Sequence, residues 1–195
     1  MRKILCLSVL ILMIGCNLPN REQISRERLA AHRDSVMAGL SDFYSLERDS
    51  FTEGEVLDVK PLNRPADIRK DAVWAYFTVK DKTATQFRLV IQNSPRYSVP
   101  GTDLFTFNVD GKVCRVMLQS YMKHESLGGS YYLIPSGYAS ELIDSLTNNS
   151  VVRMKTSSLG SGYTVRDVPS EQIRDVLKVW HDYRELGGKL EAPDI

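Results

Sequence analysis

The sequence has few of the residues from which most metal sites and disulfide scaffolds are built. Among its 195 residues are only three cysteines and three histidines, and no internal repeat or low-complexity tract is present. After residue 16 no segment is apolar over the roughly 20 residues that a membrane-spanning helix needs. These shortages exclude a disulfide-rich scaffold, a repeat array and a protein with several membrane spans.

The clearest pattern lies in the first sixteen residues. Arg2 and Lys3 are followed by an almost uninterrupted apolar run from Ile4 to Ile14, and Gly15 then precedes Cys16. The run is too short to cross a bilayer as a helix, and polar residues follow it at once. It is typical of an export signal.

Met13-Ile14-Gly15-Cys16 resembles the lipobox of bacterial lipoproteins, although that family usually has Leu where Met13 stands. The resemblance implies that residues 1–15 are a signal peptide and that Cys16 is the lipid attachment site, carrying diacylglycerol and further acyl chains such as palmitate. Residues 16–24 would then be a lipidated tether before a globular domain at 25–195. An ordinary secretory signal with an incidental Cys16 is the alternative.

The residue after the cysteine bears on location. In lipoproteins of this kind an aspartate there commonly marks retention in the inner membrane, whereas this chain has Asn17. The resemblance therefore implies a cell-envelope protein of the outer membrane rather than the inner one, with the periplasmic face favoured over the cell surface.

Charge and cysteine content limit which partners and which disulfides the mature chain can have. Removal of residues 1–15 leaves 23 basic and 24 acidic side chains, a balance that does not favour nucleic acid as a partner. With Cys6 removed and Cys16 lipidated, Cys114 has no intramolecular disulfide partner. It lies in the apolar run from Val113 to Leu118, so we expect a buried free thiol.

Helical patterns occur near both ends. Apolar residues recur at three- and four-residue spacing from Ser25, which predicts a helix that ends near Asp49-Ser50. A second helix is predicted by the stripe Ile173, Val176, Leu177 and Trp180, with Asp167 or Ser170 as its cap and Gly187-Gly188 as its end. A short helix is expected over Ser140–Leu146.

Strand patterns fill the middle of the chain. Period-two alternation predicts strands over 73–79 and 87–92, joined by Asp81–Ala84, with further strands at 55–60, 131–134, 151–155 and 163–168. Asp110-Gly111 predicts a two-residue hairpin turn in which Val109 pairs with Lys112, Phe107 with Cys114 and Phe105 with Val116. The expected fold is α+β, an antiparallel sheet with an N-terminal and a C-terminal helix packed against it.

The order of elements carries a second likeness. The Asp-Gly hairpin, the helix start at Pro135-Ser136-Gly137-Tyr138 and a later strand with Arg153 resemble the C-terminal layout of exported invasion-associated locus B-type proteins. Those proteins carry cysteines that this chain lacks. The likeness concerns topology, so no functional residue follows from it.

No catalytic, metal or cofactor site stands out. His124 and Glu125 precede a glycine-containing segment and are expected in a loop, where they could transfer protons. His181 and Glu185 share a helical face that is half of a metal site at most, and His32 lies among charged residues. Gly160-Ser161-Gly162 is explained by a hairpin turn. Several tyrosines could furnish a binding surface: Tyr97, Tyr121, Tyr131, Tyr132 and Tyr138.

These patterns favour a non-catalytic protein without cofactors, attached to a membrane by its N-terminal lipid. It would act as a binding or accessory subunit of an envelope or secretion assembly, with an envelope protein as its partner. Two alternatives stay open: a periplasmic hydrolase with a site near His124 and Glu125, and a surface-exposed factor for host interaction or exclusion.

Overall fold

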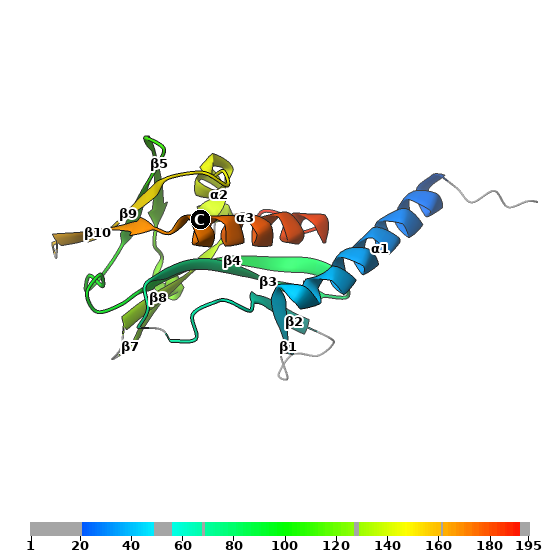
Figure 1. Cartoon of the computed structure of the whole chain (residues 1–195), viewed down its shortest axis with the longest axis horizontal. Coiled ribbons are helices and arrows are strands. Elements are labelled where there is room, and N and C mark those ends of the chain that lie inside the picture. Colours follow the sequence, from blue (N-terminus) through cyan, green and yellow to red (C-terminus); the bar gives the residue numbers. More distant parts are fainter. Residues whose placement is uncertain (1–20, 49–55, 68, 127–128, 161, 192–195) are drawn as a thin grey trace, which may run out of the picture. The chain divides into compact units, whose positions relative to one another are not determined.

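The computed structural model describes residues 21–48, 56–67, 69–126, 129–160 and 162–191 (Figure 1). Cys16 and the rest of the signal region lie outside these residues. Within them the elements are α1 (Arg21–Gly39), η1 (Leu40–Asp42), β1 (Tyr44–Arg48), β2 (Val56–Pro61), β3 (Ala72–Lys80), β4 (Thr83–Asn93), β5 (Leu104–Val109), β6 (Lys112–Met117), η2 (Ser120–Met122), β7 (Lys123–Ser126), β8 (Gly129–Pro135), α2 (Ser136–Ser145), β9 (Val152–Ser158), β10 (Gly162–Val168) and α3 (Ser170–Glu185).

The fold is α+β, as expected, but its strands form two antiparallel sheets rather than one. The larger sheet has the strand order β1-β2-β3-β4-β8-β7, and the smaller has the order β10-β9-β5-β6. The sheets meet in the core, where the Phe105 and Tyr132 rings pack edge to face with centroids 4.9 Å apart. Buried Arg166 on β10 also donates to the carbonyl oxygens of Ala72 and Gln92, both at 3.2 Å.

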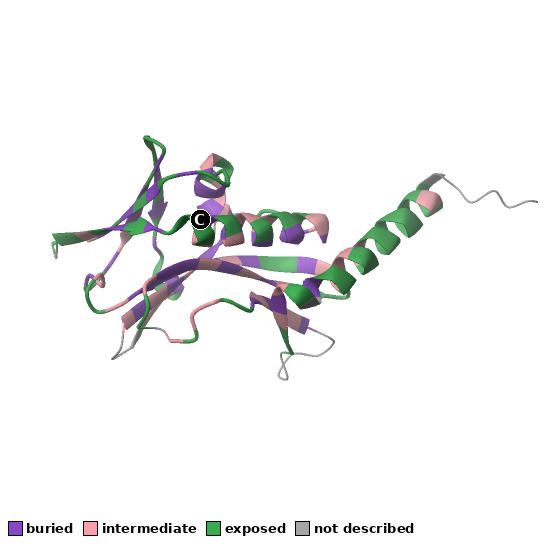
Figure 2. Cartoon of the chain, viewed as in Figure 1, coloured by how far each residue is buried: buried purple, intermediate pink, exposed green. Residues whose placement is uncertain are grey.

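The chain divides into two units, Met1–His32 and Arg33–Ile195, and α1 crosses the boundary between them. In the first unit, helical residues 22–32 are exposed except for half-buried Ile24, and Gln23 bonds Glu27 at 3.1 Å (Figure 2). In the second unit, Val36 and Met37 pack against the core. The helix begins at Arg21 rather than at Ser25.

The predicted end of the N-terminal helix at Asp49-Ser50 is wrong. The α-helix ends at Gly39, and Tyr44–Arg48 is the edge strand β1, in which Tyr44 pairs with Pro61 of β2. The spacing of the apolar residues suits a helix, but Tyr44 is buried against the Phe77 ring only when the segment is extended. Sheet pairing therefore overrides the helical pattern.

Two hairpins follow the sequence closely. The predicted pairing of Asp110-Gly111 is confirmed in full, with Val109 opposite Lys112, Phe107 opposite Cys114 and Phe105 opposite Val116. The connection between β3 and β4 is shorter than expected, because Asp81 and Lys82 alone form it with φ angles of 50° and 58°. Positive φ at both central residues is the geometry of a tight hairpin turn.

Three helix and loop predictions need correction. The short helix α2 begins at Ser136 and not at Ser140, directly after Pro135 ends β8. This start lies within Pro135-Ser136-Gly137-Tyr138, the helix start named for the second likeness. Neither Asp167 nor Ser170 caps α3, since Pro169 occupies the cap position without a side-chain bond. His124 and Glu125, expected in a loop, lie in the edge strand β7, which pairs with β8. The predicted end of α3 is confirmed, with the Gly188 amide donating to the Tyr183 carbonyl at 2.9 Å.

One part of the core lies between the larger sheet and α3, and it continues to the smaller sheet and α2. Helix α3 runs along one face of β3 and β4 (Figure 1), which we call the inner face. There the Phe87 ring lies 5.0 Å from Trp180 and 5.5 Å from Tyr183, and all three belong to one aromatic cluster. The opposite side of the larger sheet is called the outer face, and no described helix packs on it.

Candidate functional site

The outer face carries polar and aromatic side chains in rows set by strand register. Asp58 of β2 pairs with Thr78 of β3, Tyr76 pairs with Arg88 of β4, and Trp74 pairs with Val90. Residues between them in the strands, such as Phe77 and Leu89, are buried on the inner face. The period of two therefore places one half of each strand in the core and the other half on this surface.

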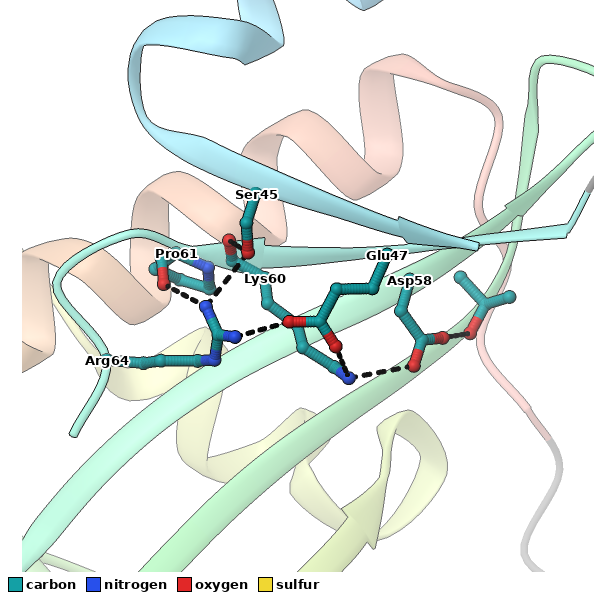
Figure 3. Close-up of polar contacts among 7 residues, drawn as sticks. Ser45, Glu47, Asp58, Lys60, Pro61 and Arg64 are labelled. Atoms are coloured by element: carbon teal, nitrogen blue, oxygen red, sulfur yellow. Dashed lines mark hydrogen bonds and ion pairs between the residues drawn. The ribbon is translucent and has the colours of Figure 1, made fainter. Parts of the chain in front are cut away.

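A cluster of charged residues lies where β1 and β2 meet on the outer face (Figure 3). The Lys60 ammonium lies 2.6 Å from the Glu47 carboxylate and 3.0 Å from that of Asp58. Arg64 donates to Glu47, and it also reaches the Ser45 hydroxyl at 2.9 Å. Because two acids meet two bases, the cluster offers hydrogen-bonding groups with little net charge.

The pKa values in the cluster reflect these contacts. The hydrogen bond from Lys60 lowers the pKa of Glu47, against a smaller opposing effect of burial. Burial lowers the pKa of Lys60, but its hydrogen bonds with Glu47 and Asp58 outweigh this, and the net pKa is raised. Both groups stay charged at neutral pH, so the geometry of the cluster is maintained there.

Aromatic rings adjoin the charged cluster. The Trp74 and Tyr76 centroids are 5.8 Å apart, and the Lys60 ammonium lies 5.6 Å from the centre of the Tyr76 ring. The Trp74 indole donates to buried Gln92 at 2.9 Å, which fixes the orientation of the ring. Burial raises the pKa of Tyr76, and so does the neighbouring carboxylate of Asp58. Its hydroxyl therefore remains a hydrogen-bond donor at neutral pH.

Further aromatic rings lie toward the other edge of the larger sheet, on β8 and β7. The His124 and Tyr131 rings stack with centroids 4.6 Å apart and planes 8° from parallel. Tyr131 pairs in the sheet with Gln92, and the Gln92 side chain accepts the hydrogen bond from the Trp74 indole. Residue Gln92 of β4 therefore links the two ends of the surface. Val90, which pairs with Trp74 and Leu133, is 1% exposed. We call Trp74, Tyr76, Tyr131 and His124 the aromatic surface.

A cavity extends the surface beyond Trp74. It has a volume of about 320 Å³ and is lined by the segment after β2, the start of β3 and the first turns of α3. Trp74 and Arg64 both border it, as does Asp175, whose carboxylate accepts a 2.7 Å bond from Asn63. Half-buried rings beside a polar cavity suit the binding of a protein segment.

The structure places the other predicted site residues on different elements. His124 and Glu125 lie in β7, where the register pairs His124 with Tyr131 and Glu125 with Ser130. His181 is 72% exposed and lies 3.9 Å from Glu185. No group of three acidic, cysteine or histidine residues suited to a metal occurs among the described residues. His32 is exposed in α1.

Cys114 is buried, as predicted. It is 1% exposed, and its thiol lies 3.4 Å from the Ser145 hydroxyl on α2. Of the five tyrosines considered for a binding surface, Tyr132 is wholly buried, Tyr121 is exposed and Tyr131 belongs to the aromatic surface. Tyr97 and Tyr138 are half-buried.

Sequence reasoning missed the buried polar contact between β1 and α3. The Tyr44 hydroxyl donates to Asp182 at 2.6 Å, and Lys178 donates to the same carboxylate oxygen at 2.8 Å. Burial, followed by this bond, raises the pKa of Tyr44 far above its ordinary value. The residues are 138 positions apart, so no local pattern could have found the contact.

The charged cluster predicts a pH dependence of stability. A carboxylate with a lowered pKa stabilises the fold above its unfolded pKa of about 4.5, and this contribution is lost as pH falls through the folded value. We therefore expect acidification from neutral pH to pH 3 to destabilise wild type more than Lys60→Met. The effect will be at most about 1 kcal/mol, because the pair is partly exposed. Urea unfolding at both pH values measures it, and an equal acid sensitivity of both proteins would contradict it.

Comparison with known proteins returned no match of any kind: no family model, no curated protein and no solved structure resembles this chain. No helix among the described residues is long and apolar enough to span a bilayer.

Proposed function

We propose that this protein is a lipid-anchored binding subunit of the bacterial cell envelope that recognises a partner protein through the outer face of its larger sheet. The anchor is the lipidated Cys16 implied by the lipobox-like sequence at its N-terminus. The outer membrane is the proposed site, with the domain facing the periplasm. The protein would act without catalysis, as an accessory to a larger envelope or secretion assembly.

The single observation that carries the proposal is the aromatic surface next to the charged cluster. Tryptophan and tyrosine are the residues most enriched among those that dominate protein interfaces. Here Trp74 and Tyr76 are held in place by Gln92 and Lys60, so little side-chain entropy is lost when a partner binds. The compensated charges around Lys60 supply a polar rim.

Site-specific crosslinking in the cells of origin tests the proposal. A photoreactive phenylalanine derivative at Tyr131 is expected to capture one discrete partner protein. The same derivative at Arg184, exposed on α3, is the matched control and is expected to capture none. Equal capture from both positions, or from neither, would contradict the outer face as the binding surface.

The aromatic side chains should dominate the affinity for that partner. We expect the Trp74→Ala and Tyr76→Ala variants each to bind the captured protein at least thirtyfold more weakly, the size typical of aromatic residues central to an interface. Purified proteins and calorimetry measure this, with Arg184→Ala as the control. A change below threefold in both variants would remove the aromatic surface from the interface.

A further inference from the structure

The smaller sheet has an exposed face whose side chains are sorted into rows. Across its strands, Met117 pairs with Leu104, Leu104 with Ser157, and Ser157 with Tyr163. Met117 is 63% and Tyr163 65% exposed, although both are large and apolar in most of their surface. We call Met117, Leu104 and Tyr163 the apolar row; the Ser157 hydroxyl between them donates to the Leu104 carbonyl at 3.3 Å. The apolar row lies at the end of the sheet where β6 ends and β10 begins.

A row of cations lies directly behind the apolar row. Two residues further along the strands, Arg115 pairs with Thr106, Thr106 with Lys155, and Lys155 with Val165. No described carboxylate forms an ion pair with Arg115 or with Lys155, and the Lys155 ammonium lies 4.3 Å from the centre of the Tyr163 ring. We call Arg115 and Lys155 the cationic pair.

Beyond the cationic pair, the charges of the next row form an ion pair. The next row holds Arg153 and Asp167, which form an ion pair at 3.0 Å. At the apolar end the Asp103 carboxylate accepts a 3.0 Å bond from the Leu159 amide, and Leu159 itself is 94% exposed. Within these two rows, positive charge without a paired carboxylate is therefore carried by the cationic pair. Elsewhere on the sheet Lys112 bonds the Ser145 hydroxyl, and Asp103 keeps its negative charge.

The distance between the apolar row and the cationic pair is close to the thickness of the lipid headgroup layer. Two residues along a strand span about 7 Å, and the polar headgroup layer on each side of a membrane is about 5 to 7 Å thick. Apolar side chains that reach the acyl boundary would thus place the cationic pair at the lipid phosphates. Tyrosine is enriched at this interface, and lysine and arginine are attracted to anionic lipid.

We propose that this end of the smaller sheet docks on a bilayer that contains anionic lipid. The apolar row and Leu159 enter the interface, and the cationic pair contacts lipid phosphates. This contact is a second attachment to the membrane, made by the folded domain and separate from any lipid on Cys16. It would hold the domain in one orientation and leave the outer face of the larger sheet available for a partner.

Binding to vesicles tests the proposal with the full chain carrying Cys16→Ala, so that no lipid anchor contributes. The vesicles are phosphatidylcholine alone or phosphatidylcholine with about one-third phosphatidylglycerol, whose phosphates carry the negative charge. Each cation near such a surface changes partitioning about fivefold, so R115Q/K155Q is expected to lower partitioning about twenty-fivefold on anionic vesicles. On neutral vesicles the same variant should partition like the parent chain.

Matched variants separate this contact from general effects of charge and from the apolar signal segment, which all the proteins share. K70Q/K189Q removes two exposed cations elsewhere and is expected to change partitioning less than twofold. M117S/Y163S should lower it at least tenfold. The proposal would be overturned if R115Q/K155Q and K70Q/K189Q lowered partitioning onto anionic vesicles equally, or if M117S/Y163S did not lower it.

An acidic protein partner is the competing outcome. If soluble polyglutamate binds the chain through the cationic pair while the vesicles do not distinguish R115Q/K155Q from the parent chain, the surface recognises acidic protein and the proposal fails. Neither result depends on the lipidation of Cys16 or on binding at the outer face, so failure here and failure of the proposed function are distinguishable.

Discussion

Replacing Cys16 with alanine is expected to abolish incorporation of a fatty-acid probe and to leave residues 1–15 attached to the chain. The proposed modification joins diacylglycerol to the Cys16 thiol, and alanine has no atom that could accept it. Each buried methylene contributes about 0.8 kcal/mol to membrane affinity, so two or three acyl chains attach a protein stably. Metabolic labelling and intact-mass spectrometry of wild type and Cys16→Ala measure both effects.

Cys114→Ala is the matched control for this experiment, because it removes a cysteine that is 1% exposed and outside the signal region. It should retain full labelling. A wild-type protein whose Cys16 is unmodified, or labelling that survives in Cys16→Ala, would remove the basis for the lipid anchor. The binding surfaces of the folded domain would then belong to a protein without an N-terminal lipid anchor.

Phe87→Ala is expected to lower the free energy of unfolding by about 3 to 5 kcal/mol, the range measured for large aromatic residues in cores. Phe87 is 0% exposed and packs edge to face on Trp180 of α3. Truncation leaves a cavity between the larger sheet and α3 that rigid strands cannot close. Since whole domains are stable by about 5 to 15 kcal/mol, the variant should be close to unfolding at growth temperature.

Urea unfolding followed by circular dichroism measures this loss. Phe87→Leu is the control, since it keeps most of the apolar volume and should cost clearly less than the alanine variant. Equal losses from both would show that the contact with Trp180 and Tyr183 is specific to an aromatic ring. A loss below 1 kcal/mol in Phe87→Ala would contradict the packing of α3 on this sheet.

Elements with a strong local pattern were predictable. The hairpin at Asp110-Gly111 combines a turn dipeptide with strict alternation on both sides, so its register followed from the sequence alone. Helix α3 has a long apolar stripe and a terminal glycine, Gly187, with a φ of +84°. In both cases the residues that decide the structure are neighbours in the chain.

Elements that depend on distant partners were not predictable in the same way. Tyr44–Arg48 follows a helical spacing, yet it is a strand because β2 pairs with it and Asp182 accepts the Tyr44 hydroxyl. Lys123–Ser126 has a loop-like composition, yet it pairs with β8. Edge strands of this kind take their conformation from the neighbouring strand more than from their own residues.

In the candidate surfaces, too, the local strand pattern was predictable, whereas the contacts between strands were not. Alternation in the sequence predicted a strand over 73–79, but not that Trp74 and Tyr76 within it adjoin Lys60 and its two carboxylates. Likewise, Arg115 and Lys155 are 40 positions apart, and only the pairing of β5 with both β6 and β9 places them in one row.

The sequence alone determined the α+β class, the hairpin register, the burial of Cys114 and the lipobox-like N-terminus, because each depends on residues within a few positions of one another. The tertiary structure decided the division into two sheets, the end of α1 and the composition of both exposed surfaces. Those features arise from hydrogen bonds and side-chain contacts between strands that are far apart in the chain, and no local periodicity encodes which strands will meet.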